Sequence, residues 1–483
     1  MMRIYNTLTN RKEEFKPLNY PYVNMYTCGV TVYDDCHIGH GRSLYIFEVV
    51  RRYLKFRGYK VKLVRNITDV DDKIINKAKE LSRKEGISLK DAFGRVRNRY
   101  IKSYYADLND LGVAKADIEP LATDNIPMMV SFIEKLIEKG FAYRKGGNVY
   151  FRIRKFKDYG KLSGRKIDDL FSGVRIEPDP LKEDVLDFAL WKERKDDEPS
   201  WNSPFGEGRP GWHIECSVMA NRFLGETLDI HGGGKDLIFP HHENEIAQSE
   251  ALLEKPFSLY WMHHGLLTIG GRKMSKSLGN FITLKEAVAK HSAEVIKIAY
   301  LSTHYRSPLD FSEEKLKECK RVKERIGVFL KQLESRTETQ IGSDCKNIPH
   351  RFSYKEFDGL YAKFIEAMDD DFNTPLGFSV VFDIVKVVNE NLDKTKQFFL
   401  EAQNLLKIIL CIFSIEKLAC YPTVEDINLS LPSDEEINNK IALRASLRKQ
   451  GKFKEADAIR SELLSKGIVL EDQPTGKTIW YRK

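Results

Sequence analysis

A chain of 483 residues is too long for one ordinary hydrophobic core, so we expect two to four packed units. The sequence is 42% hydrophobic, but it has no run of eighteen apolar residues and no apolar signal segment near Met1. We therefore expect a cytoplasmic protein without a membrane partner. The formal charge of +8 is compatible with a polyanionic partner but does not by itself indicate one. Seven scattered cysteines argue against a disulfide framework and favour free packing thiols.

The first hundred residues alternate between strand-like and helix-like patterns. Residues 23–28 predict a strand, the apolar spacing from 41 to 56 predicts a helix, and 59–65 predict a second strand after Gly58. A strand, a long crossover helix and another strand are typical of a parallel sheet. We therefore expect an α/β fold that begins with a Rossmann-like domain, although it lacks a Gly-x-Gly-x-x-Gly loop.

The pattern changes several times along the remaining chain. Charge clusters and a Gly146-Gly147 turn between strand-like segments indicate an insertion that splits the sheet domain. Beyond about residue 310 the chain becomes mainly helical, and a small α/β unit with two helices and a terminal hairpin follows. The expected borders are a sheet domain at 1–120 and 203–260, an insertion at 121–202, a further segment at 261–315, a helical bundle at 316–431 and a final unit at 432–483.

Two short strings carry the residue types that phosphate chemistry needs. His37-Ile38-Gly39-His40 lies where the first strand meets the first helix, and a helix N-terminus attracts phosphate. Gly39 has no side chain, so a flat base could lie against its backbone. Lys273-Met274-Ser275-Lys276-Ser277 follows two glycines and predicts a mobile cationic clamp for a phosphoryl transition state. Each string alone also fits an ordinary surface segment.

Together, in this order and with an insertion between them, the two strings resemble the ATP-binding signatures of class I aminoacyl-tRNA synthetases. Within that class the chain is similar to the cysteinyl-tRNA synthetase family over nearly its whole length. The motifs that carry this resemblance are residues 25–34, 66–73, 211–217, 229–234, 241–245 and 456–480. The resemblance implies that 261–315 contacts the tRNA stem and contains the lysine loop, and that 432–483 reads the anticodon.

The resemblance also implies one zinc ion per chain, held by Cys28, Cys216, His241 and Glu245. His241 and Glu245 stand at i and i+4, a spacing that places both on one helix face, whereas the two cysteines come from distant segments. Zinc binds a thiolate far better than a hydroxyl, so the site would select cysteine over serine. Without the resemblance, two buried cysteines and an ordinary polar helix would be the simpler interpretation.

The other site residues also follow from the resemblance. His37, His40, Lys273 and Lys276 are expected to be catalytic, and all of these except Lys273 are also expected to contact ATP. The remaining expected contacts are Gly39, Gly234 and Asp236 for ATP, and Thr68, Trp212 and His231 for the amino acid. Asp229 could be a polar anchor or a local cap, and His263 and His264 could be structural or lie beside adenine.

The expected activity is the ATP-dependent activation of L-cysteine, with Mg²⁺ on the nucleotide, followed by transfer to tRNA(Cys) by a monomeric ligase. Basic residues near the start of the final unit, with aromatic ones at its end, suit unpaired bases. Those near the start are Arg444, Arg448, Lys449, Lys452 and Lys454, and those at the end are Trp480, Tyr481, Arg482 and Lys483. Two alternatives stay open: a ligase that joins cysteine to an amino-sugar, and a paralogue that binds without catalysis.

Overall fold

The computed structural model divides the chain into two compact units, Met1–Ala419 and Cys420–Lys483. It describes residues 1–167, 180–195, 198–274, 279–340, 351–419, 434–465, 468–472 and 478–482. Among these residues, no helix combines the length and the apolar character that crossing a membrane requires.

A four-stranded parallel sheet forms the centre of the first unit. Its order is β10-β9-β3-β4, and neighbouring strands pair in parallel. The strands are β3 (Tyr22–Thr27), β4 (Lys60–Arg65), β9 (Leu228–Gly234) and β10 (Ser258–His264). Every residue of β9 is buried, as expected for a strand covered on both faces. The predicted parallel α/β sheet is confirmed, and its carboxyl ends all lie along one edge.

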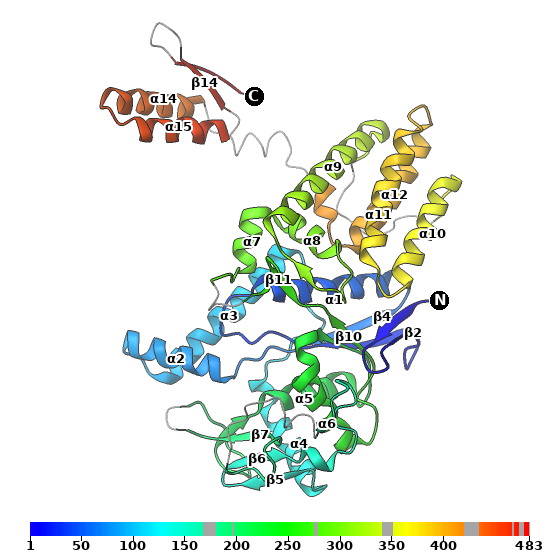
Figure 1. The fold of residues 1–483 in the computed structure, drawn as a ribbon, viewed down its shortest axis with the longest axis vertical. Coiled ribbons are helices and arrows are strands. Elements are labelled where there is room, and N and C mark those ends of the chain that lie inside the picture. Colours follow the sequence, from blue (N-terminus) through cyan, green and yellow to red (C-terminus); the bar gives the residue numbers. More distant parts are fainter. Residues whose placement is uncertain are drawn as a thin grey trace. The chain divides into compact units, whose positions relative to one another are not determined.

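Three helices belong to the first part of the chain: one connects β3 to β4, and two follow β4 (Figure 1). α1 (Ile38–Phe56) crosses from β3 to β4 and buries thirteen of its residues, which confirms the predicted crossover helix. α2 (Asp72–Glu85) and α3 (Leu89–Leu111) pack against each other as a helical hairpin. Asp71 caps the start of α2 by accepting from the Lys73 backbone N–H, and Gly86 ends the helix with a positive φ of 64°. A short N-terminal hairpin joins β1 (Arg3–Asn6) to β2 (Arg11–Glu14).

The segment between the two halves of the sheet forms its own antiparallel sheet of order β5-β6-β7-β8. The turn at Gly146 needs a positive φ of 62°, which explains the glycine there. The elements are α4 (Ile126–Glu138), β5 (Ala142–Lys145), β6 (Asn148–Phe151), β7 (Phe188–Glu193) and β8 (Gly208–Pro210). α5 (Trp212–Leu224) and α6 (Glu243–Leu253) then frame β9 in the sequence.

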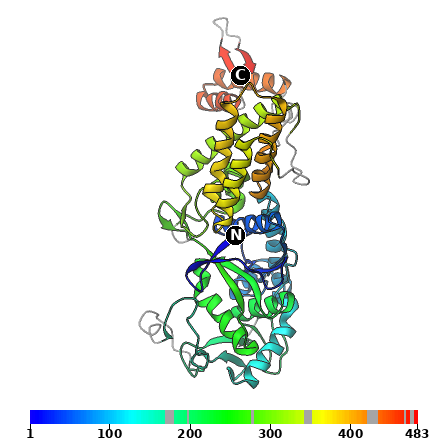
Figure 2. The same ribbon diagram turned by 90° about the vertical axis from the view of Figure 1, so that its right-hand side faces the viewer.

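After β10 the chain passes through a small sheet into helices. The sheet has the order β12-β11-β13, and the helices α9 to α12 pack side by side (Figure 2). Its strands are β11 (Leu267–Ile269), β12 (Arg272–Lys273) and β13 (Leu309–Asp310). The helices are α7 (Leu284–His291), α8 (Ala293–Leu301), α9 (Glu313–Thr337), α10 (Lys355–Asp369), α11 (Thr374–Asn389) and α12 (Lys396–Ile412). Cys411 in α12 is disulfide-bonded, so the expectation of a free packing thiol is wrong for this residue.

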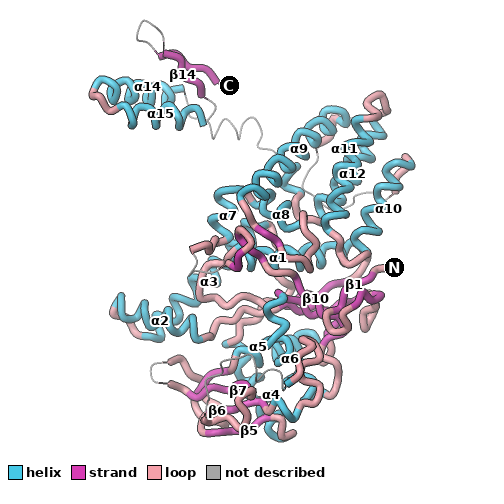
Figure 3. The backbone as a smooth tube through the Cα atoms, in the orientation of Figure 1, coloured by secondary structure: helices cyan, strands magenta, loops and turns pink. Residues whose placement is uncertain are grey.

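The second unit has its own small core, formed by Ile437, Leu463, Ile468 and Leu470. Its secondary structure is two helices followed by an antiparallel hairpin, as predicted (Figure 3). The elements are α14 (Asp434–Lys449), α15 (Phe453–Ser465), β14 (Ile468–Asp472) and β15 (Thr478–Arg482). Arg444 is only 2% exposed and donates to the Thr478 hydroxyl, so it is a packing residue and is not available to RNA.

Candidate functional site

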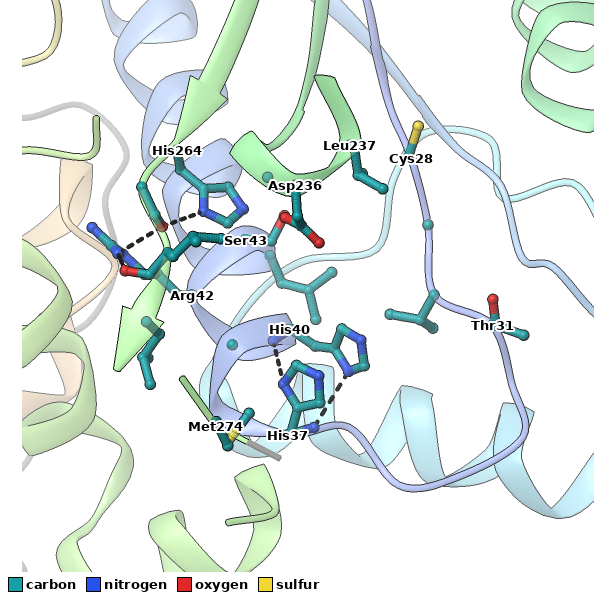
Figure 4. Close-up of a pocket in the computed structure, with 18 of the residues that line it drawn as sticks. Cys28, Thr31, His37, His40, Arg42, Ser43, Asp236, Leu237, His264 and Met274 are labelled. Carbon is teal, nitrogen blue, oxygen red and sulfur yellow. Dashed lines mark hydrogen bonds between the residues drawn. The ribbon is translucent and has the colours of Figure 1, made fainter. Parts of the chain in front are cut away.

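A cavity of about 380 Å³ opens at the carboxyl ends of β3, β9 and β10, where ligands bind in parallel α/β sheets (Figure 4). The first turn of α1 forms one wall, and the residues that follow the three strands form the others. The lining includes Cys28, Gly29, Thr31, Tyr33, His37, Gly39, His40, Lys73, Trp212, Gly234, Asp236, His264 and Met274. Seven predicted site residues, far apart in the sequence, thus line one cavity or its rim.

His37 and His40 cap the N-terminus of α1 reciprocally. His37 is the N-cap residue, and its Nδ1 accepts from the His40 backbone N–H at 3.1 Å. The Nδ1 of His40 accepts in turn from the His37 backbone N–H at 3.3 Å. The two rings stack with their centroids 3.6 Å apart, side by side in the cavity wall (Figure 4). The pair therefore satisfies two backbone donors that a helix start leaves free.

This capping determines which ring nitrogens can meet a ligand. A nitrogen that accepts a hydrogen bond carries no proton, so both neutral rings carry their proton on Nε2. Burial lowers the pKa of His40 well below its ordinary value, and the positive charges of Lys73 and of a protonated His37 lower it further. The His40 ring is thus a neutral donor at physiological pH. Gly39 lies close beneath the pair, because a Cβ there would come within 2.9 Å of the His37 ring.

Four side chains converge beside this cavity and could hold a metal ion. They are Cys28 after β3, Cys216 in α5, His241 in the turn before α6, and Glu245 in the first turn of α6. Their ligand atoms all lie within 4.8 Å of one another. His241 Nε2 lies 3.1 Å from Glu245 Oε1, and Cys28 Sγ lies 3.5 Å from the same oxygen. Thiolate, imidazole and carboxylate are the ligand types of zinc.

The charges at this cluster fit a bound cation. Burial raises the pKa of Cys28 well above its ordinary value, and the neighbouring Cys216 and Glu245 raise it further. A divalent cation would reverse this effect, because coordination stabilises the thiolate form. The Nδ1 atom of His231, which lies next to the cluster, is buried without a hydrogen-bond partner among the described residues. The donor set therefore suits a metal better than it suits an ordinary protein core.

A second ligand set overlaps the first, with His231 and His242 in place of Cys216 and His241. His242 Nε2 lies 3.2 Å from Cys28 Sγ, and its Nδ1 lies 2.7 Å from His263 Nε2. His242 is not among the residues that the sequence predicted for this site. The signal that could have pointed to it is its position directly after His241, on the turn that leads into α6.

Two residues at the start of α5 hold the His241 ring in place. His213 Nδ1 lies 2.9 Å from His241 Nδ1, which leaves His241 Nε2 directed at Glu245. Burial lowers the pKa of His213 to about 3, so this ring is neutral. Trp212 stacks on the His241 ring at 4.3 Å and stays 41% exposed at the rim of the cavity. Such outer partners fix the orientation of a metal-ligating imidazole.

Comparisons with known proteins agree with this geometry. Residues 14–321 match the family model described as the tRNA synthetases class I (C) catalytic domain, and residues 363–415 match a DALR domain. The chain is 46% identical to the cysteine–tRNA ligase of Thermodesulfovibrio yellowstonii over 99% of each chain. It is 47% identical to the enzyme of the same name from Aquifex aeolicus, over 100% of this chain and 99% of the relative. The chain belongs to the cysteine–tRNA ligase family.

Solved structures of other class I synthetases share the fold of this cysteine–tRNA ligase family member. Mycobacterium tuberculosis methionyl-tRNA synthetase with methionyl-adenylate aligns at a TM-score of 0.57 and 13% identity, over 85% of this chain and 92% of that one. An arginyl-tRNA synthetase structure from Campylobacter jejuni aligns at a TM-score of 0.55 and 14% identity, over 82% and 92%. At such low identity these structures support the fold alone.

The amino-acid contacts expected for a cysteine–tRNA ligase are only partly brought together. Trp212 lines the cavity. His231 is buried behind it, with Nε2 at 2.8 Å from Glu245 Oε2 and its ring stacked on Trp261. Thr68 is also buried: its hydroxyl donates to Glu215 at 2.8 Å, and its backbone pairs with Thr31. Thr68 therefore positions the strand that lines the cavity, and its direct contact with the amino acid stays a prediction.

Some of the nucleotide contacts expected in this family line the cavity, whereas Lys276 is not among the described residues. Gly234 and Asp236 line the cavity with the two histidines, and so does His264. Lys273 belongs to β12, which pairs with β11, and the neighbouring Met274 lines the cavity. The start of the lysine loop is thus at the cavity.

Asp229 has a structural role at the opposite end of the sheet. Its two carboxylate oxygens accept from the backbone N–H groups of Leu18 and Asn24, both at 2.6 Å. It lies at the start of β9, whereas the cavity lies at the end of that strand. Of the two interpretations offered by the sequence, the local cap is the one that this geometry supports.

Proposed function

We propose that the chain activates L-cysteine with ATP to form cysteinyl-adenylate and then transfers cysteine to tRNA(Cys). The observation that carries this proposal is the position of the cluster of Cys28, Cys216, His241 and Glu245. It borders the same cavity whose wall contains the paired histidines of α1. A thiol-selecting site and a phosphate-binding helix start are what a cysteine-activating enzyme needs. Relatives that share 46–47% identity over the full length carry the name cysteine–tRNA ligase.

The metal we propose is one zinc ion per chain, with Cys28, Cys216, His241 and Glu245 as its ligands. When bound there, zinc would supply a Lewis acid that favours a substrate thiolate over a serine hydroxyl. A hydrophobic pocket alone separates two such similar side chains by only about 1–3 kcal/mol. Cys28 faces the cavity while Cys216, His241 and Glu245 are buried. This leaves the substrate side of the site at Cys28, in the cavity that Trp212 also lines.

The chain's own residues would act on the phosphates. The cysteine carboxylate attacks the α-phosphorus of ATP, the bond to the β-phosphate oxygen breaks, and pyrophosphate leaves. His37 and His40 donate from Nε2 to phosphate oxygens, because capping keeps their Nδ1 atoms engaged. Lys273 and Lys276 would add positive charge, and Mg²⁺ would accompany ATP. The terminal ribose hydroxyl of tRNA then attacks the adenylate carbonyl carbon, and AMP leaves.

The final unit and the helical bundle would bind tRNA, and we propose that the protein works as a monomer in the cytoplasm. The final unit has a core of its own, so it could bind RNA as a separate module.

The proposal is tested by aminoacylation of a tRNA(Cys) transcript with radiolabelled cysteine by the full chain. We expect charging of this transcript, no charging of a serine tRNA, and severe loss in Lys276→Ala with its metal content unchanged. Activation without charging of any tRNA would favour the amino-sugar ligase instead. Near-normal charging by Lys276→Ala would contradict the role of that lysine.

A further inference from the structure

Three large apolar or aromatic side chains are exposed within five residues, on the loop that leads into β3. Leu18 is 48% exposed, Tyr20 74% and Tyr22 55%. We call residues 18–22 the tyrosine loop. Two neighbouring tyrosines this exposed are unusual, because large aromatic side chains are normally mostly covered and clustered exposed ones mark binding surfaces. The site described above uses none of these residues.

The tyrosine loop is held rigidly in place. The buried Asp229 carboxylate accepts from the backbone N–H of Leu18, the first residue of the loop, and from that of Asn24, two residues after its end. Within the loop, the Tyr22 N–H donates to the Asn19 carbonyl at 2.7 Å, and the Lys60 N–H donates to the Pro21 carbonyl at the same distance. The exposure of the tyrosines is therefore not the result of a loose segment. A preorganised surface loses little conformational entropy on binding.

One exposed cation lies against the Tyr22 ring, and others lie on the neighbouring chain segments. Lys60 pairs in register with Tyr22, and its Nζ lies 5.2 Å from the centre of that ring. Tyr20 packs edge-on against Tyr59, which follows the exposed Arg57. Lys62, two residues after Lys60, is exposed as well. Lys16 and Lys55 add two more exposed cations to the neighbouring chain segments. Lys16 is paired with Glu14 and Arg57 with Asp369, while the Lys62 Nζ donates to the Phe223 carbonyl at 2.7 Å.

We propose that the tyrosine loop and the cations around it form a second RNA-binding surface, which takes unpaired nucleotides. Bases would stack on Tyr20 and Tyr22, and phosphates would meet Lys60 and Lys62. Rigid aromatic faces among cations are the chemistry that binds single strands without sequence preference. An acidic protein fits less well, because lysine is depleted at protein interfaces.

This surface is distinct from the candidate active site. Tyr22 begins β3 and Lys60 begins β4, whereas the cavity lies past the carboxyl ends of the parallel strands. A strand of six residues spans about 20 Å, so the two sites lie at opposite edges of the sheet. RNA bound at the tyrosine loop would leave the cavity open.

The test is a titration of a fluorescein-labelled decauridylate with the full chain, followed by fluorescence anisotropy. The variant with Tyr20→Ala and Tyr22→Ala removes both stacking faces, and Tyr20→Phe with Tyr22→Phe keeps them as a matched control. We expect the Ala pair to bind at least about 10-fold more weakly, since stacking contributes roughly 1–3 kcal/mol per base. The Phe pair should bind as the wild type does.

Replacing Lys60 and Lys62 by Gln tests the phosphate contacts. The slope of log affinity against log salt concentration should become shallower by about 0.7 for each charge removed.

Photocrosslinking with a 4-thiouridine decamer separates this surface from other RNA-binding parts of the chain. We expect crosslinks on the peptide that contains residues 18–22, and their loss in the Ala pair but not in the Phe pair. Unchanged affinity in the Ala pair, or crosslinks only elsewhere, would overturn the proposal. So would binding of polyglutamate in place of RNA, which would make the partner an acidic protein. Cysteine-dependent pyrophosphate exchange should stay normal in both pairs, so failure of the proposed function would show separately, in the wild type.

Discussion

The paired histidines of α1 combine two tasks that a single substitution can separate. Each Nδ1 caps a backbone N–H, while each Nε2 is left to carry a proton toward a ligand. The sequence predicted that both residues share a helix turn near phosphate. It did not predict the reciprocal cap, because histidine is not a preferred N-cap residue and the geometry depends on the stacked rings.

His37→Asn should keep the cap and lose the catalytic donor. Asparagine is among the best N-cap residues, so the melting temperature should stay near that of the wild type. Pyrophosphate exchange should fall by about 10²–10³-fold, the usual effect of removing one transition-state donor. His37→Ala is the comparison variant: it should lose the same activity and also about 1 kcal/mol of stability. Full exchange activity in His37→Asn would show that the ring has only a structural role.

Cys216→Ser should remove tightly bound metal from the protein. Serine is similar in size to cysteine, but its hydroxyl stays protonated and binds zinc poorly. Metal per chain, measured by atomic absorption after dialysis, should drop well below one. Cys319→Ser provides the control, since Cys319 is a buried free thiol in α9, outside the cluster. Equal metal content in the two variants would remove Cys216 from the ligand set.

Among single residues, the sequence predicted best where spacing or a motif limits the geometry. The i and i+4 spacing of His241 and Glu245 is local, and their ligand atoms do converge. His213 and His242 escaped prediction because their roles depend on ring orientations set by tertiary contacts. The burial of Thr68 and His231 also depends on neighbours distant in sequence, Glu215 and Trp261.

At the scale of elements, α6 carries Glu245, one of the four proposed metal ligands, and is fixed by the insertion. The buried Glu243 carboxylate accepts from the backbone N–H groups of Gly160 and Ser163, at 2.9 and 2.8 Å. Tyr159 donates to Asn244 at 2.6 Å. The insertion thus also supports α6 and, through it, the cluster of Cys28, Cys216, His241 and Glu245. The pattern of charges and glycines predicted that an insertion exists, but not which helix it would hold.

A buried lysine joins α8 to the end of α12. Lys297 is 1% exposed, and its Nζ donates to the Ser414 carbonyl at 2.6 Å. Burial lowers the pKa of Lys297 to about 8, whereas an unfolded chain has a lysine pKa of about 10.4. Between these values the unfolded state binds more protons, so the contribution of Lys297 to stability rises with pH.

This linkage predicts a pH-dependent difference between the wild type and Lys297→Met. Below pH 8 the charged lysine is buried at a cost, so the gap in unfolding free energy, taken as wild type minus Lys297→Met, has its lowest value there. From pH 8 to pH 10.4 the gap should widen in favour of the wild type, by at most about 3 kcal/mol. Thermal unfolding of both proteins at pH 7, 8.5 and 10 measures it. A gap that stays constant over this range would mean that Lys297 keeps an ordinary pKa when folded.

The strands and helices were predictable where periodicity is strong. The strand, crossover helix and strand of the first sixty-five residues appear as β3, α1 and β4, and the terminal hairpin as β14 and β15. The turn at 238–242 was not predictable, because Phe239 interrupts it with an extended backbone. The disulfide of Cys411 also went against composition, which favours free thiols in a chain of this kind.

At the scale of the whole molecule, the two units have separate cores, so the first should function without the second. A chain that ends at Leu431 should keep cysteine-dependent pyrophosphate exchange, since the cavity and the metal-site residues belong to the first unit. The apparent tRNA KM should rise at least about 10-fold, as expected when contacts worth about 1.4 kcal/mol or more are lost. Equal loss for cysteine, ATP and tRNA would instead mean that the final unit is needed for folding.

The most direct test of the central claim is ATP–pyrophosphate exchange with cysteine and with serine, with zinc measured in the same sample. We predict strong exchange with cysteine alone, at about one zinc per chain, since a thiolate-binding metal separates the two substrates by more than packing can. Exchange with both amino acids, or none with zinc fully present, would contradict a cysteine-selecting metal centre in this cavity.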